Sequence, residues 1–145
     1  MRSPTQIALS RQHAAAGPER ATARAAARIA EDGDSQRTAV AAARAALEKK
    51  AEDVVVLDLR GVSGYTDFLV IGSGGSDRQL EAIAESVEKE LTARGHRVIG
   101  SEGQRGGRWV LLDFGDVVVH VFHGEERAHY DLEGLWADAP RIEVE

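Results

Sequence analysis

The chain has 145 residues, which is enough for one domain with a proper core but short for two. It contains no cysteine, which excludes disulfides, thiolate catalysis and zinc–sulfur sites, and no apolar run approaches the ~20 residues of a membrane span. The net charge of −6 is unevenly distributed, because residues 1–30 carry five arginines against one glutamate, whereas the remainder carries 13 Lys and Arg against 23 Asp and Glu. An acidic body is repelled by phosphate backbones, so the charge predicts a basic protein partner and no direct nucleic acid binding.

The N-terminal segment, residues 1–35, is rich in alanine and arginine and lacks bulky apolar residues. Such a composition cannot offset the entropy of ordering, which predicts a disordered extension. An arginine-rich, acid-poor stretch is also typical of organellar transit peptides. We therefore expect a cytoplasmic protein, with an organellar location as the alternative if residues 1–30 are a transit peptide.

The remaining chain is predicted to form a single domain over residues 36–141, followed by a short tail over residues 142–145. Apolar residues at helical spacing predict a first helix that ends at Lys49-Lys50, and two apolar, β-branched runs (54–59 and 68–71) predict strands. A glycine-serine run, Gly72 to Ser76, follows the second strand. Ser76 and Gln79 then form the sequence signature of a capping box, and Gly95 marks the end of that helix.

The last third of the chain is predicted to contain a short strand at 97–99, a polar loop at 101–108, a hairpin at 109–122 and a helix at about 125–136. Pro140 is expected to stop further regular structure. The order of elements predicts an α/β fold in which one mixed β-sheet is packed with helices.

The hairpin separates its side chains into two faces, because alternate residues of a strand point in opposite directions. If Phe114 and Gly115 form the loop, Asp113 lies opposite Asp116 and Trp109 lies opposite His120. One face is rich in valine. The other carries the residues that we expect to bind a partner, with Tyr130 from the following helix: Trp109, Leu111, Asp113, Asp116, His120, Phe122 and Tyr130.

Two interpretations of this mixed face remain open from the residues alone. Tryptophan dominates protein–protein hot spots, and the two aspartates would form an acidic rim that attracts lysine or arginine. Alternatively, Trp109 is a half-buried strand residue that the chain's own loop 101–108 covers.

No catalytic motif in the sequence is complete, so no catalytic, cofactor or metal site is predicted. The run from Gly72 to Ser76 lacks the lysine of a P-loop, and Asp113-Phe114-Gly115 matches a kinase motif by letter only. His120, His123 and His129 lack the spacing of a zinc helix. A nucleotidyltransferase would need paired carboxylates downstream of Ser73, where the chain has only small or apolar residues at 82–84.

Several segments resemble the ribosomal silencing factor family RsfS, whose members are also called Iojap-like proteins. They are K-K-A-E-D-V-V-V-L-D-L-R (49–60), D-F-L-V-I (67–71), S-D-R-Q (76–79), W-V-L-L-D-F-G-D-V-V-V-H-V-F (109–122), Y-D-L-E (130–133) and L-W-A-D-A-P-R (135–141). The match covers roughly residues 38–141, and the first 35 residues have no counterpart. Leu69 and His129 stand where larger aromatic residues are expected in this family.

The resemblance implies a non-enzymatic translation repressor that binds the large-subunit ribosomal protein uL-fourteen and prevents the small subunit from joining. It also implies a nucleotidyltransferase-like fold without the metal carboxylates. The family's contact tryptophan corresponds to Trp109, and Asp113, Asp116 and Tyr130 also match the family pattern. The alternatives are a nucleotidyltransferase-like nucleotide-binding enzyme and an organellar ribosome assembly factor of the same family. An exposed aromatic face could also support a homodimer.

Overall fold

The computed structural model describes residues 34–62, 64–103 and 108–144. Residues 34–48 are helical, so regular structure already includes the last two residues of the predicted N-terminal extension. The rest of that extension lies outside the described residues, as does most of the polar loop expected between residues 101 and 108.

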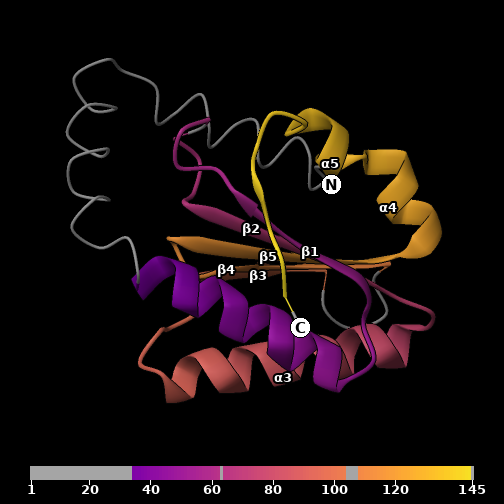
Figure 1. The fold of residues 1–145 in the computed structure, drawn as a ribbon. Coiled ribbons are helices and arrows are strands. Elements are labelled where there is room, and N and C mark those ends of the chain that lie inside the picture. Colours follow the sequence, from indigo (N-terminus) through magenta and orange to yellow (C-terminus); the bar gives the residue numbers. More distant parts are fainter. Residues whose placement is uncertain (1–33, 63, 104–107, 145) are drawn as a thin grey trace.

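The described residues form one mixed six-stranded sheet with helices on both faces, which confirms the predicted α/β class (Figure 1). The elements are β1 (Glu52–Asp58), β2 (Phe68–Gly74), α3 (Asp77–Ala93), β3 (Gly100–Glu102), β4 (Trp109–Asp113), β5 (Val117–His123), α4 (Gly124–Tyr130), α5 (Leu132–Leu135) and β6 (Arg141–Ile142). The strand order is β3-β4-β5-β2-β1-β6, in which only β2 and β5 pair in parallel. The helix 34–48 and α3 cover one face, and α4 and α5 lie over the other (Figure 1).

The face of the sheet that α3 covers is an apolar core. Its residues recur with helical spacing on α3 and at alternate positions on the strands. α3 buries the stripe predicted from sequence (Leu80, Ile83, Ala84, Val87 and Leu91) against the valine-rich face of the hairpin. The helix 34–48 contributes only small side chains, and Ala39, Ala42 and Ala43 are fully buried. Small residues let the two helices approach closely, and the Ser86 hydroxyl donates to the Ala45 carbonyl across their contact at 2.9 Å.

Both predicted ends of α3 are confirmed. The Ser76 side chain accepts from the Gln79 backbone N–H at 3.1 Å. Gly95 has a φ of +90°, and its N–H donates to the Thr92 carbonyl while the His96 N–H donates to the Leu91 carbonyl, which is a Schellman ending. The Gln79 amide also donates to the carbonyls of Lys49 and Lys50, and so ties the start of α3 to the end of the first helix.

The predicted hairpin register is wrong by two residues. Asp113 pairs with Val118, Leu111 with His120, and Trp109 with Phe122. The turn holds three residues because the Asp113 carboxylate accepts the Gly115 N–H at 2.8 Å and so closes a longer loop, in which Gly115 has a φ of +90°. A shift of two residues keeps the parity of the strand, so the predicted division into two faces is correct.

Several other boundaries differ from the prediction. The short strand lies at Gly100–Glu102, and the long C-terminal helix is split at Asp131, whose backbone is left-handed (φ 44°). Pro140 does not end regular structure, because its carbonyl accepts from the Asp58 N–H and β6 then pairs with β1. Gly72, Ser73 and Gly74 belong to β2, so most of the predicted glycine turn is buried strand. No helix among the described residues is both long and apolar enough to cross a bilayer.

Candidate partner-binding face

A second apolar cluster fills the space between the sheet and the two short helices α4 and α5. We call this side of the sheet the α4–α5 face. It takes alternate residues from four strands and closes with Leu132, Trp136 and Ala139 from the C-terminal segment. Its members are Leu57, Leu59, Tyr65, Leu69, Ile71, Trp109, Leu111, Val118, Phe122, Leu132, Trp136 and Ala139.

Trp109 lies on this face at the start of β4 and is 8% exposed. Gly103, which follows β3, approaches it closely, since a Cβ added at Gly103 would lie 3.1 Å from the indole Cε3 and overlap the Trp109 carbonyl oxygen. Part of the chain's own loop therefore contacts the indole, as the second interpretation expected. Leu111 lies two residues further along β4 and is 3% exposed.

His120 and Phe122 are buried on β5, with exposures of 0% and 1%. Their rings stack with centroids 5.7 Å apart, and Tyr130 of α4 packs on Phe122 at 5.9 Å. Tyr130 is half-buried, so this row of three rings leads from the interior towards the surface. His120 and Phe122 cannot contact a partner in this arrangement, and their physical role is to support the Tyr130 ring from below.

Burial lowers the pKa of His120 to about 3, because the charged imidazolium would lose its hydration. The ring is therefore neutral at physiological pH. Neither ring nitrogen has a hydrogen-bond partner among the residues that the structure describes. A neutral imidazole still carries one N–H, so the fold leaves at least one buried donor unsatisfied at a cost of about 1–3 kcal/mol.

The two aspartates of the hairpin turn have different roles, and they do not face each other as predicted. Asp113 is 6% exposed and closes the turn through Gly115. Asp116 is exposed at the tip. Its backbone carbonyl accepts from the N–H groups of Asp67 and Phe68 at 3.1 and 3.0 Å, which anchors the tip to the start of β2. Only Asp116 therefore presents a solvent-exposed side chain at this tip.

An ion-pair network around α4 was not predicted from the sequence, because it joins residues far apart in the chain. Arg127 donates to Glu133 at 2.9 Å and to the Ser73 hydroxyl at 2.8 Å. His123, at the end of β5, lies 2.8 Å from Asp77 of α3. These contacts connect α4 to the ends of two strands and to the first turn of α3.

The same network bears on the nucleotidyltransferase alternative. The side chain of Arg127 is 12% exposed and lies against Ser73. A nucleotidyltransferase would need a metal ion, held by carboxylates, next to Ser73. A guanidinium in this place repels a cation. Among the described residues, no group of three or more His, Cys, Asp or Glu side chains is arranged to hold a metal. The Arg127 guanidinium therefore disfavours a metal ion beside Ser73.

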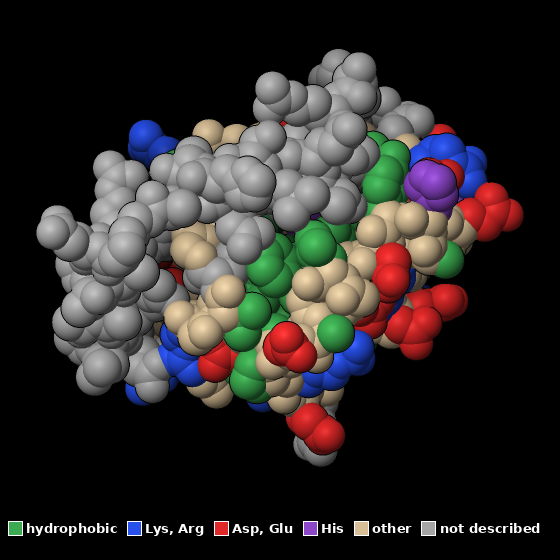
Figure 2. Space-filling view, turned by 90° about the horizontal axis from the view of Figure 1, so that it is seen from above, with side chains coloured by type: hydrophobic (Ala, Val, Ile, Leu, Met, Phe, Trp, Pro, Cys, Tyr) green, Lys and Arg blue, Asp and Glu red, His purple; other side chains and the backbone are tan. Residues whose placement is uncertain are grey.

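The outer surface on this side combines apolar and acidic groups. Figure 2 shows a strip of hydrophobic side chains with Asp and Glu, and also Lys and Arg, side chains along one margin. Leu135 of α5 and Val62 of the β1–β2 connection are each 38% exposed. An apolar centre with a charged edge is typical of protein–protein interfaces.

Comparison with known proteins identifies the family. Residues 32–145 match the family described as "Ribosomal silencing factor during starvation", RsfS. The chain belongs to the RsfS family. It is 50% identical over 98 residues to the ribosomal silencing factor RsfS of Halalkalibacterium halodurans, which covers 68% of this chain and 84% of that protein. It is 36% identical over 114 residues to the chloroplastic protein Iojap of Zea mays, which covers 79% of this chain and 50% of that protein.

A solved structure shows that the RsfS relatives share the fold as well as the sequence. The crystal structure of a protein from Chromobacterium violaceum is similar with a TM-score of 0.68 at 38% identity, over 70% of this chain and 85% of that one. The family resemblance predicted from the motifs is thus confirmed.

Proposed function

We propose that this protein is a ribosomal silencing factor that binds uL-fourteen on the large ribosomal subunit and sterically prevents the small subunit from joining. The observation that carries the proposal is the match to the RsfS family over residues 32–145, which includes every strand and helix described above. Relatives of this chain bear the name ribosomal silencing factor. The proposed action needs a surface for a basic protein and needs no catalytic group.

Charge supports a basic protein as the direct partner. Residues 31–145 carry a balance of −10, and Asp116 projects from a hairpin tip that backbone and side-chain hydrogen bonds hold in place. A rigid acidic tip steers a cationic surface during encounter and loses little entropy on binding. An acidic body on a ribosome is therefore best accommodated beside a basic ribosomal protein.

The proposed contact combines residues of different accessibility. Asp116 and the half-buried Tyr130 are the accessible members of the predicted set, whereas Trp109 is buried and 8% exposed. Leu111, His120 and Phe122 support these groups from beneath, and Asp113 sets the shape of the turn. An interface hot spot usually consists of a few anchor residues among neighbouring residues that exclude water.

Sedimentation with purified ribosomal subunits tests the proposal. We expect the protein to migrate with the large subunit and not with the small one, and to reduce the amount of joined particles. A matched control uses two exposed acidic residues: Asp116→Lys at the hairpin tip should weaken the effect, whereas Glu85→Lys on α3 should not. Co-migration with the small subunit, or unchanged joining at saturating protein, would refute the proposal.

Location and self-association follow as secondary proposals. We expect action in the cytoplasm. The chloroplastic name of the maize relative, and the name of a mouse relative, "Mitochondrial assembly of ribosomal large subunit protein 1", keep an organellar assembly role as the alternative. Import and cleavage of residues 1–30 in isolated organelles would favour that alternative. A homodimer through the α4–α5 face would compete with the ribosome, so sedimentation velocity of the free protein should show a dimer that large subunits dissociate.

A further inference from the structure

A groove on the opposite side of the sheet gathers positive charge in an otherwise acidic body. It lies between the helix 34–48 and the C-terminal end of α3 and has a volume of about 440 Å³. Three of its six lining residues are arginines, and the other three are one polar and two apolar residues. The six are Gln36, Arg37, Val40, Ala41, Arg44 and Arg94.

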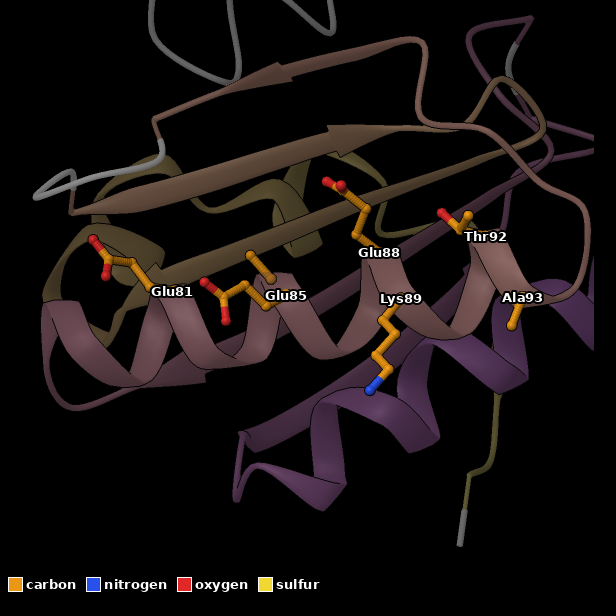
Figure 3. A pocket seen from close by; sticks show the side chains of 7 residues that line it. Glu81, Glu85, Glu88, Lys89, Thr92 and Ala93 are labelled. Atoms are coloured by element: carbon orange, nitrogen blue, oxygen red, sulfur yellow. The ribbon is translucent and has the colours of Figure 1, made fainter.

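The guanidinium groups of this groove are largely available. Arg37 and Arg44 are exposed, and neither forms an ion pair or hydrogen bond with the described residues. Arg94 pairs with Glu90 at 2.9 Å, but its side chain is still 49% exposed. We call this feature the arginine groove. It contrasts with the neighbouring groove along α3, where Glu81, Glu85 and Glu88 predominate (Figure 3).

The arginine groove and the acidic hairpin tip lie at the same end of the molecule. A small pocket of about 30 Å³ is lined by Thr38 of the first helix, His96 after α3, and Asp116 of the tip, among others. The Thr38 hydroxyl and the His96 ring are 3.1 Å apart. Arg37 precedes Thr38 in the first helix, and Arg94 lies two residues before His96. The arginine groove therefore lies next to the acidic tip.

We propose that the arginine groove binds the phosphate backbone of RNA, while the acidic tip binds the basic protein beside it. Arginine presents a planar fork of donors that matches the oxygens of a phosphate, and three such groups around one groove suit a polyanion. Residues 1–33, which precede the first helix, hold five arginines and three acids, a weaker bias of the same sign. That the polyanion is RNA and not an acidic polypeptide rests on the proposed function, because a ribosome places RNA next to its basic proteins.

The arginine groove changes the expectation, drawn from net charge, that the protein does not bind nucleic acid directly. A balance of −10 predicts repulsion from phosphate when the charges are averaged over the body. At physiological ionic strength the Debye length is only about 8 Å, so a phosphate in the groove responds to the nearest guanidinium groups more than to distant carboxylates. Local placement therefore decides the sign of the interaction.

The test is fluorescence anisotropy of the full chain with a labelled single-stranded RNA, titrated at several salt concentrations. The double variant Arg37→Glu/Arg44→Glu removes the groove's two unpaired arginines. The matched control Lys49→Glu/Arg78→Glu changes the net charge equally, at exposed positions at the far ends of the same two helices. Both variants keep residues 1–33, so any contribution of that segment is common to them.

We expect the groove variant to lose at least about fivefold in RNA affinity at low salt and its salt slope to fall by about 1.4, while the control stays within about twofold of the wild type. Equal losses in both double variants would reduce the effect to net charge and overturn the proposal, as would unchanged binding. A polyglutamate peptide that binds the groove as tightly as RNA would assign it to an acidic protein, which also overturns it. Subunit sedimentation is independent of this result, so failure of the proposed function and failure of the groove remain distinguishable.

Discussion

Arg127 of α4 donates to the hydroxyl of Ser73 on β2 across a distance of 2.8 Å, and this contact links the cover of the α4–α5 face to the sheet. α4 buries none of its own residues, so packing contributes little to its position. The helix is held mainly by polar contacts of its side chains, such as those of Arg127, and by the ring contact between Tyr130 and Phe122. Its attachment should therefore be sensitive to single polar substitutions.

Replacing Arg127 with alanine should lower the free energy of unfolding by about 1–3 kcal/mol, because the Glu133 carboxylate and the Ser73 hydroxyl would both lose a charged partner. Arg108 is the matched control, since its pairs with Glu125 and Glu126 are more exposed and should contribute less than the Arg127 contacts. Urea denaturation measures both. Equal losses in the two variants would contradict the assigned role of Arg127.

His120 should make stability depend on pH. Its folded pKa is about 3 and its unfolded value is 6.5, so the unfolded state binds the proton first as pH falls. The stabilising effect of the neutral ring is complete above pH 6.5 and is lost progressively between pH 6.5 and 3, by up to about 1.4 kcal/mol per pH unit. The variant His120→Leu should lack this component and should be about 1 kcal/mol more stable near pH 7, because it removes an unsatisfied buried polar group.

Chemical denaturation of the wild type and His120→Leu at a series of pH values checks both parts. The other histidines are common to the two proteins, so the difference between the curves isolates His120. Parallel curves from pH 7 to 4 would show that the ring is not buried in its neutral form.

Asp131 joins α4 to α5 in a left-handed conformation, and its side chain accepts the Gly134 N–H at 3.0 Å. The variant Asp131→Asn keeps an oxygen acceptor and tolerates this conformation, so it should change stability by less than about 0.5 kcal/mol. Asp131→Ala loses the cap and strains the backbone, and should cost about 1–2 kcal/mol. Thermal unfolding of the pair is the measurement, and an alanine variant as stable as the asparagine variant would argue against the cap.

Two aromatic substitutions should separate folding from partner binding. Tyr130 is half-buried, so Tyr130→Ala should lower large-subunit affinity by about tenfold with a modest loss of stability. Trp109 is 8% exposed, so Trp109→Ala should cost about 3–5 kcal/mol of stability as well as about 2 kcal/mol or more of binding. Circular dichroism confirms folding before affinity is measured by sedimentation. Full affinity in a folded Tyr130 variant would remove this residue from the interface.

Reversing the charge at the hairpin tip should act mainly on association. Asp116→Lys should lower the on-rate for the large subunit several-fold at low salt and flatten its salt dependence, because the side chain is exposed and steers encounter. Glu85→Lys on α3 makes the same change in net charge at a position outside the tip and should leave the rate within about twofold. Stopped-flow measurements at two salt concentrations compare them, and identical rates for both variants would reject steering by the tip.

Features of short range could be predicted from the sequence because a few neighbouring residues contain the whole interaction. The cap at Ser76, the ending at Gly95 and the buried stripe of α3 are of this kind. The division of the hairpin into two faces depends only on strand parity. It was therefore predicted correctly although the predicted register was wrong by two residues. That error arose because the Asp113 carboxylate, not the glycine alone, sets the length of the turn.

The sequence by itself determined the α/β class, the family and the acidic character of the body, since periodicity, ordered motifs and charge are properties of the chain. Tertiary structure alone decided which predicted contact residues remain accessible: Asp116 and Tyr130 reach the surface, whereas His120 and Phe122 are covered. It also brought Arg127 to Ser73 and Arg94 beside Arg37. The physical reason is that burial and charge density depend on the packing of segments distant in the chain, and local sequence patterns do not contain that information.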